Sequence, residues 1–268
     1  MNIKMKVLWT TLTSLLVSLS AASVHAAVLA EWEFLDQASL TTDSSGNGNT
    51  LTGGTGVTVS TENYNPAGGT TTSAYFNGSQ GWLRANDMVV SSYEALQFEW
   101  SMQATGSASS TDSQRILQSN YDHNAIGGFA IYLRRDSGEI RISHRVEGGW
   151  GQAYFSVSTL DVWHEYKVVI NNADSTAEGH ITLWVDGVEQ TAISSTYSGT
   201  GSGTFLDTQL YLGSNASSAG VSATAKNLLN GYLQNVRVTA IPEVSSLAWG
   251  LILIPAVVAL RRGRVLRD

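Results

Sequence analysis

The chain of 268 residues contains no cysteine and only three prolines, and its basic side chains are outnumbered by acidic ones. The lack of cysteine excludes a disulfide scaffold, a thiolate metal site and a cysteine nucleophile. Lysine and arginine total 15 against 22 acidic residues, which gives a formal net charge of −7. Residues 27–240 are more acidic still, because residues 1–26 and 241–268 each carry a net positive charge. An acidic domain repels a phosphate backbone, so nucleic acid is excluded as a partner.

Residues 1–26 have the layout of a secretory signal peptide. Lys4 and Lys6 precede an apolar run from Val7 to about Val24, and small residues flank the expected cleavage point after Ala26. A first transmembrane helix is the alternative, but the many serines and threonines in the run make it too polar to stay in lipid. The pattern therefore predicts an exported protein.

The other end of the chain, residues 241–268, reads as a membrane-directed tail. An apolar segment over 244–260 is followed at once by Arg261, Arg262 and Arg264. At about 1.5 Å per residue such a helix comes close to spanning the roughly 30 Å hydrocarbon core. Arginines on its carboxyl side predict that the tail ends in the cytoplasm and that the preceding domain lies outside.

Pro242 and Glu243 stand just before this apolar segment, and the whole tail resembles the PEP-CTERM sorting signal of Gram-negative bacteria. In that family a Pro-Glu-Pro motif, a short membrane helix and an arginine cluster follow one another; here Val244 takes the place of the second proline. The resemblance implies an exosortase-type processing enzyme as a partner. It also implies anchoring in the inner membrane, possible release, and a final place at the cell surface or in the extracellular matrix.

Residues 27–240 show period-two alternation of apolar side chains and no sustained helical periodicity, which predicts short β-strands throughout. Phe129, Ile131 and Leu133 share one face, and a turn over 135–138 leads to Ile140 on the same face, which predicts a hairpin. The Gly-, Ser- and Thr-rich segments 50–72 and 194–203 are expected to be surface loops. Further strands are expected at 28–34, 74–77, 82–86, 96–102, 115–118, 153–157, 163–170, 181–185, 209–213 and 232–238.

These strands predict one all-β domain, a two-sheet antiparallel sandwich. Short motifs along it occur in an order that resembles the laminin G-like or concanavalin A-like jelly rolls. The resemblance implies a jelly-roll topology, a fold that hosts lectins, glycosidases and adhesive modules alike. The motifs are Trp32 to Phe34, Asp43 to Asn49, Ala74 to Gly78, Phe98 to Met102, Gly128 to Leu133, Val162 to Tyr166, Leu183 to Gly187, Tyr211 to Gly213 and Gly231 to Val238.

Asp43, Ser45 and Asn47 place side-chain oxygens at alternate positions before Gly48, like the opening of a calcium loop. One structural Ca²⁺ is therefore a candidate cofactor. No carboxylate follows where such a loop has its last ligand, so an Asx-rich turn that bonds its own backbone is the alternative.

Glu31 and Glu33 lie on one strand face, roughly 6.6 Å apart, a spacing that glycoside hydrolysis can use. The laminarinase-like enzymes of the resembled fold carry a Glu-x-Asp-x-Glu run on one strand, and this chain has none. No Ser-His-Asp elbow, phosphate loop or dinucleotide fingerprint occurs either. We therefore expect these glutamates to form a solvated face and the protein not to be an enzyme.

Candidate ligand contacts are exposed aromatic rings and a polar loop. Trp150, flanked by glycines, is the first candidate for a platform on which a sugar ring stacks, and Trp82 is the second. Asn120, Asp122 and Asn124 form a polar loop between two strands that could bond sugar hydroxyls. The alternative for the tryptophans is packing in the sandwich core. The alternative for the loop is an ordinary hairpin connection.

The sequence thus predicts a non-catalytic exported surface or matrix protein whose jelly-roll domain binds carbohydrate, an exopolysaccharide above all, or another surface polymer. Two alternatives stay open. The first is a polysaccharide hydrolase or lyase of the same fold, and the second is a purely structural envelope component without a specific ligand.

Overall fold

The computed structural model describes residues 26–53, 56–64, 72–105, 113–119, 125–157, 159–200, 203–214 and 227–241. These belong to one compact unit, Ala26–Ile241. The expected signal peptide, apart from Ala26, and the expected sorting tail from Pro242 onward, with its membrane helix over 244–260, lie outside the described residues. Within the described ranges, no helix has the length and apolar character needed to cross a membrane.

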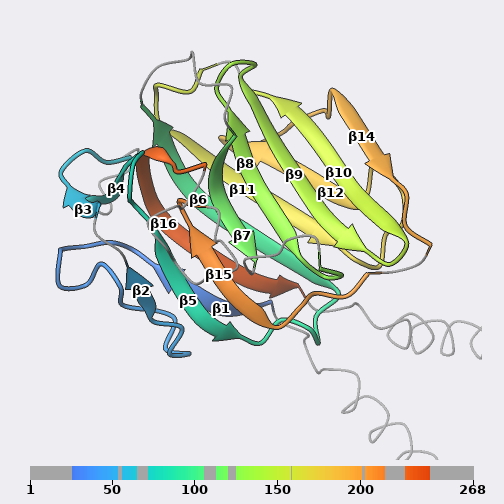
Figure 1. Cartoon of the computed structure of the whole chain (residues 1–268), viewed down its shortest axis with the longest axis horizontal. Coiled ribbons are helices and arrows are strands. Elements are labelled where there is room, and N and C mark those ends of the chain that lie inside the picture. Colours follow the sequence, from blue (N-terminus) through green and yellow to red (C-terminus); the bar gives the residue numbers. More distant parts are fainter. Residues whose placement is uncertain are drawn as a thin grey trace, which may run out of the picture. The chain divides into compact units, whose positions relative to one another are not determined.

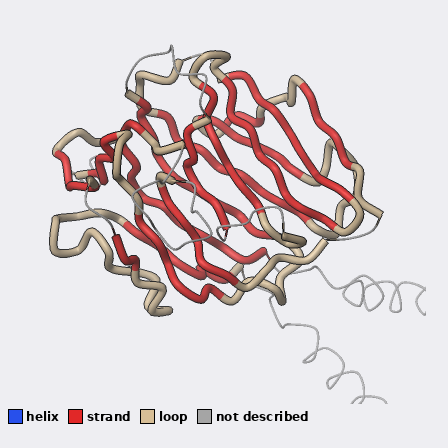
Figure 2. The backbone as a smooth tube through the Cα atoms, in the orientation of Figure 1, coloured by secondary structure: helices blue, strands red, loops and turns tan. Residues whose placement is uncertain are grey.

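Two antiparallel sheets, one behind the other in Figure 1, make up this unit. Sheet A has the order β13-β12-β11-β6-β16-β4-β3, with β1 also paired to β16, and sheet B has the order β14-β10-β9-β8-β7-β15-β5-β2. Among the described residues there are strands and loops but no helix, as Figure 2 shows. The predicted all-β, two-sheet antiparallel sandwich is therefore confirmed.

The strands of sheet A are β1 (Ala27–Trp32), β3 (Val57–Ser60), β4 (Ser73–Asn77), β6 (Ala95–Ala104), β11 (His164–Asn171), β12 (Ile181–Val185), β13 (Val188–Glu189) and β16 (Asn230–Ile241). Those of sheet B are β2 (Leu51–Gly53), β5 (Leu83–Met88), β7 (Gln114–Ser119), β8 (Phe129–Arg134), β9 (Glu139–Val146), β10 (Gly149–Ser156), β14 (Ser194–Tyr197) and β15 (Thr208–Leu212).

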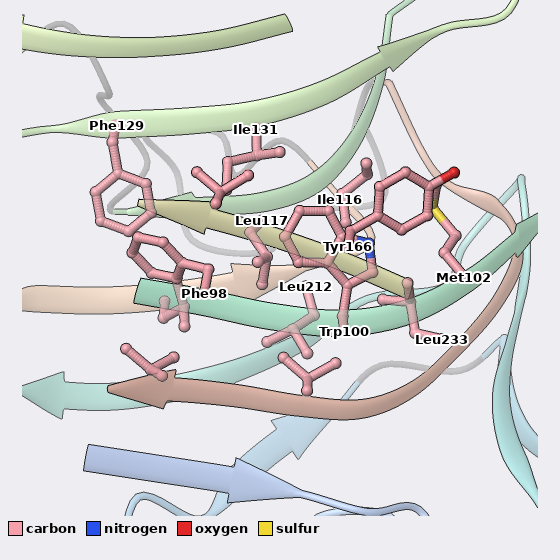
Figure 3. Packing of buried hydrophobic residues seen from close by; sticks show 14 of the residues in the cluster. Phe98, Trp100, Met102, Ile116, Leu117, Phe129, Ile131, Tyr166, Leu212 and Leu233 are labelled. Carbon is pink, nitrogen blue, oxygen red and sulfur yellow. The ribbon is translucent and has the colours of Figure 1, made fainter. Parts of the chain in front are cut away.

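The core lies between the two sheets and consists of the apolar side chains that the strands direct towards the interior. Phe98 on β6 and Phe129 on β8 meet across the interface, with ring centroids 4.8 Å apart, as Figure 3 shows. Trp100 stacks on Tyr166 of the neighbouring strand at 5.3 Å. Since successive side chains of a strand point to opposite faces, this packing fixes which residues reach the two outer faces.

The expected hairpin is present as β8 and β9, in which Ile131 pairs with Ile142 and Leu133 with Ile140. Two segments expected to be loops contain strands instead. The segment 50–72 includes β2 and β3, and the segment 194–203 includes β14, which pairs with β10. All three strands lie at sheet edges and are short. β14 is polar, whereas Leu51 of β2 and Val57 of β3 are buried in the core.

A buried histidine pair lies at the inner side of sheet B. His144 on β9 and His180, just before β12, are 0% and 1% exposed, and their rings stack with centroids 5.2 Å apart. Nδ1 of His180 donates to the carbonyl of Asp174 (2.9 Å), so its Nε2 accepts from Nδ1 of His144 (3.1 Å). This network requires the His180 ring to be neutral, since its Nε2 must accept. Desolvation, reinforced by the neighbouring His180, lowers the pKa of His144 to about 3.

We predict that the protein loses stability as the pH falls from 6.5 towards 3. The unfolded His144 takes up a proton near pH 6.5, while the folded one stays neutral until about pH 3, so protons favour the unfolded chain in that window. Between pH 6.5 and 5 this linkage removes about 2 kcal/mol of unfolding free energy.

Urea unfolding at several pH values measures this loss. The variant His144→Gln, which removes the titrating ring, should be less stable at pH 7 but should show a shallower pH dependence. An equal slope in the variant and the wild-type chain would contradict the assignment.

Candidate functional site

The outer face of sheet B carries arginines and aromatic rings in register. Arg115 on β7 is the cross-strand partner of Tyr132 on β8, which is the partner of Arg141 on β9, which in turn is the partner of Tyr154 on β10. The Arg115 guanidinium lies 4.4 Å from the Tyr132 ring centroid, and that of Arg141 lies 4.8 Å from the Tyr154 ring centroid. Four neighbouring strands thus present cation and ring alternately, held by cation–π contacts.

Arg145 and Trp150 form a second such pair on the same face. They are cross-strand partners on β9 and β10, with the guanidinium 5.0 Å from the indole ring. Nη1 of Arg145 also donates to the carbonyl of Gly149 at 3.0 Å, which fixes the guanidinium in place. We call the outer surface formed by Arg84, Arg115, Arg141, Arg145, Tyr132, Tyr154 and Trp150 the arginine–aromatic face.

The glycines beside Trp150 have a packing role rather than a role in exposing the ring. A Cβ at Gly151 would lie 2.2 Å from the ring of His180, and one at Gly149 would lie 2.4 Å from Ser198. Trp150 itself is half-buried, with its ring on the outer side of β10. Its part in ligand binding stays a prediction.

Three guanidinium groups on sheet B have no carboxylate partner. Within the described part of the chain, Arg134 and Arg141 pair with Asp136 and Glu139, whereas Arg84, Arg115 and Arg145 form no ion pair. Arg115 is only 8% exposed, and its Nε and Nη1 have no hydrogen-bond partner in the residues that the structure describes. Burial lowers the pKa of Arg115, and the neighbouring Tyr132 opposes this shift.

The outer face of sheet A differs, because carboxylates and cations alternate on it as cross-strand partners. Cross-strand partners follow in the order Glu31, Arg237, Glu99, Lys167 and Trp184. Arg237 forms an ion pair with Glu31, and the Lys167 ammonium lies 3.9 Å from the Trp184 ring centroid.

These side chains, with Glu33 and Glu165, line an open groove of about 510 Å³. The two glutamates whose spacing suggested a catalytic pair therefore share one groove. Glu31 is held by Arg237 within it rather than standing free in solvent.

The expected calcium loop is a hydrogen-bonded clamp on β1. Oδ1 of Asp43 accepts from the amides of Glu31 (3.0 Å) and Ser45 (2.9 Å), and Oδ2 accepts from the amide of Asn49 (2.8 Å). The hydroxyl of Ser45 accepts from the amide of Asn47 at 3.2 Å. Nδ2 of Asn47 donates to the carbonyl of Val28 at 2.8 Å.

This geometry favours the Asx-turn alternative, because amide hydrogens occupy the positions from which Asp43 would hold a cation. Desolvation raises the pKa of Asp43, but the hydrogen bonds from Ser45 and from the backbone outweigh it, and the net shift is downward. No group of three or more metal-ligating side chains is found in the residues that the structure describes. Calcium binding stays a prediction.

Of the remaining candidate ligand contacts, the structure describes one and leaves the polar loop outside the described residues. Trp82, directly before β5, is half-buried. Asn120, Asp122 and Asn124 lie outside the described residues. Sequence reasoning missed Tyr132 and Tyr154, although the signal was present: each is a large ring at the polar position of an alternating strand, between two buried neighbours.

Neither a protein-family profile nor a curated protein sequence matches the chain. Solved structures do match. Domain 4 of AbnA, a GH43 extracellular arabinanase from Geobacillus stearothermophilus solved with arabinotriose, superposes with a TM-score of 0.54 at 16% identity, over 84% of this chain and 98% of that domain. The binding domain of botulinum neurotoxin serotype D gives 0.55 at 14% identity, over 90% of this chain and 52% of that one.

A further structure is that of botulinum neurotoxin type C, whose cell entry depends on interaction with two ganglioside molecules; it gives 0.55 at 12% identity and covers 84% of this chain. This chain spans about half the length of the neurotoxin binding domains. At these identities the likeness defines the class of fold, a β-sandwich that also occurs in carbohydrate-binding domains. The laminin G-like and PEP-CTERM resemblances stay predictions.

We predict that Asp43→Ala lowers the unfolding free energy by about 2 kcal/mol or more, because it leaves three backbone amides without their acceptor. The loss should be the same in calcium and in chelator when measured by urea unfolding. A loss seen with calcium but absent in chelator would instead show that Asp43 acts through a bound ion.

Proposed function

We propose that this domain binds carbohydrate on the arginine–aromatic face of sheet B and does so without catalysis. The observation that carries the proposal is the presence of three half-buried rings on the solvent side of β8 and β10, which flank β9: Tyr132, Trp150 and Tyr154. Flat sugar faces stack on such rings, while arginine and amide groups beside them donate hydrogen bonds to sugar oxygens.

The rigidity of this surface supports the proposal. Tyr132 and Tyr154 each lie beside a cross-strand arginine, and the strands that carry them are anchored by the buried core between the sheets. Side chains that are already fixed lose little conformational entropy when a ligand binds. The fold neighbours add support, since the arabinanase domain was solved with arabinotriose and neurotoxin type C interacts with gangliosides.

A hydrolase of the same fold is the competing proposal. It would need two free carboxylates flanking a scissile bond, roughly 5 to 9.5 Å apart. In the groove of sheet A, Glu31 is engaged by Arg237, and Glu99 lies beside the same arginine in the strand register. These contacts favour a structural role for Glu31 and Glu99, and release of reducing sugar by the purified chain would favour the enzymatic alternative.

We also propose that the protein is exported and held or released at the cell surface, with an exosortase-type enzyme as its processing partner. The support comes from the sequence: the signal-like residues 1–26, the Pro242-Glu243 dipeptide and the apolar segment followed by Arg261, Arg262 and Arg264. A surface location would give the binding face access to extracellular polysaccharide.

We predict that Trp150→Ala and Tyr154→Ala each weaken polysaccharide binding, roughly threefold to tenfold, because each removes one stacking ring. Retention of the full chain on a panel of immobilised neutral and acidic polysaccharides, followed by titration of those retained, measures this loss. Unfolding curves establish that each variant is folded.

Trp184→Ala is the matched control, since Trp184 is a half-buried ring stacked with a cation on the outer face of the other sheet. Its affinity should equal that of the wild-type chain. If Trp184→Ala were the only variant to lose affinity, the binding site would lie in the groove of sheet A instead. A chain that binds no polysaccharide on the panel would favour the purely structural role.

A further inference from the structure

We infer that the arginine–aromatic face recognises an acidic polysaccharide, one whose sugar rings carry carboxylates at intervals along the polymer. The inference rests on the proposed carbohydrate-binding function and narrows its ligand class. It is carried by the charge pairing of the arginines, by the burial of one of them, and by their distribution over the sheet.

The arginines on the two sheets fall into two groups, those that pair with a carboxylate and those that do not. Arg134 and Arg141 on sheet B and Arg237 on sheet A each hold a carboxylate. Among the residues that the structure describes, Arg84, Arg115 and Arg145 hold none, although the chain as a whole is acidic. In a protein with surplus carboxylates, unpaired guanidiniums concentrated on one outer face form a positive surface that complements a polyanion.

Arg115 adds a buried positive charge beneath this surface. It is 8% exposed, with the Tyr132 ring on one side, and its Nε and Nη1 have no hydrogen-bond acceptor among the described residues. A buried charge without a counter-charge destabilises the fold. A carboxylate bound at the outer surface above this guanidinium would supply a compensating charge.

The distribution of the three arginines indicates a polymer rather than a small anion. Arg84 lies on β5 and Arg145 on β9, with β15, β7 and β8 between them. Four strand spacings separate the two backbones by about 19 Å, and Arg115 lies between them on β7. One carboxylate cannot reach all three, whereas an extended chain with repeated charges can.

A polysaccharide fits better than a nucleic acid. The net charge of −7 opposes the dense charge of a phosphate backbone, whose binding depends on long-range attraction. A polyuronate has one charge per sugar at most, and its rings can stack on Tyr132, Tyr154 and Trp150 between the arginine contacts.

The test compares polymers that differ only in charge. Polygalacturonate, polymannuronate and hyaluronate are each titrated against the purified full chain beside their methyl-esterified, neutral counterparts. We expect at least one polyuronate to bind roughly tenfold or more tightly than its ester, and added salt to weaken that preference. Arg84→Gln and Arg145→Gln should each lower the ratio of polyuronate affinity to ester affinity several-fold, because the lost charge weakens binding of the polyuronate more than binding of its ester.

Arg134→Gln is the matched control, because Arg134 lies on the same sheet but its charge is already neutralised by Asp136. It should keep the preference. Equal binding of every polyuronate and its ester would overturn the inference but leave the carbohydrate-binding function intact, and absence of binding to any polysaccharide would overturn both. Tighter binding of single-stranded DNA, lost in the same arginine variants, would show that the partner is a nucleic acid.

Discussion

The packing of the two sheets' inner faces against each other is the constraint on which the rest of the structure depends. Contacts such as that between Phe98 and Phe129 bury alternate side chains of strands from both sheets. Because strand geometry sends the intervening residues outward, the core dictates the composition and spacing of both solvent faces. The ring of Tyr132 is outside because Ile131 and Leu133 are inside.

The same constraint explains why the two outer faces can differ in chemistry. On sheet A, cross-strand neighbours neutralise one another, as in the series from Glu31 through Arg237 and Glu99 to Lys167. On sheet B, Arg115, Arg141 and Arg145 lie against rings, and of these three only Arg141 also pairs with a carboxylate among the described residues. A cation over a ring keeps its charge, so sheet B retains a positive, aromatic surface within an acidic protein. The surface is carried by strands, whose positions the core fixes, rather than by loops.

Much of this fold could be predicted from the sequence, and the limits have physical causes. Period-two alternation predicted the β8–β9 hairpin, because burial on one face leaves a local signature. It could not predict β14, since the polar residues Ser194 to Thr196 pair through their backbones at a sheet edge. The spacing of Asp43 and Ser45 predicted a turn rich in side-chain oxygens. Its contact with the amide of Glu31 depends on chain segments that meet only in the folded structure.

For the candidate site, sequence reasoning placed Trp150 on a surface but could not assemble its surroundings. The alternation of Arg115, Tyr132, Arg141 and Tyr154 exists only across four strands in register, and register depends on the packing of the whole sheet. That Arg115 has no carboxylate partner among the described residues is likewise a property of three dimensions, since the sequence does not show which side chains lie beside its guanidinium.

A crystal structure of the chain with a bound acidic oligosaccharide tests the central claim most directly. We predict sugar rings against Trp150 and Tyr154, with sugar carboxylates beside the unpaired arginines of sheet B. An oligosaccharide lodged in the groove of sheet A, between Glu31 and Trp184, would contradict the account.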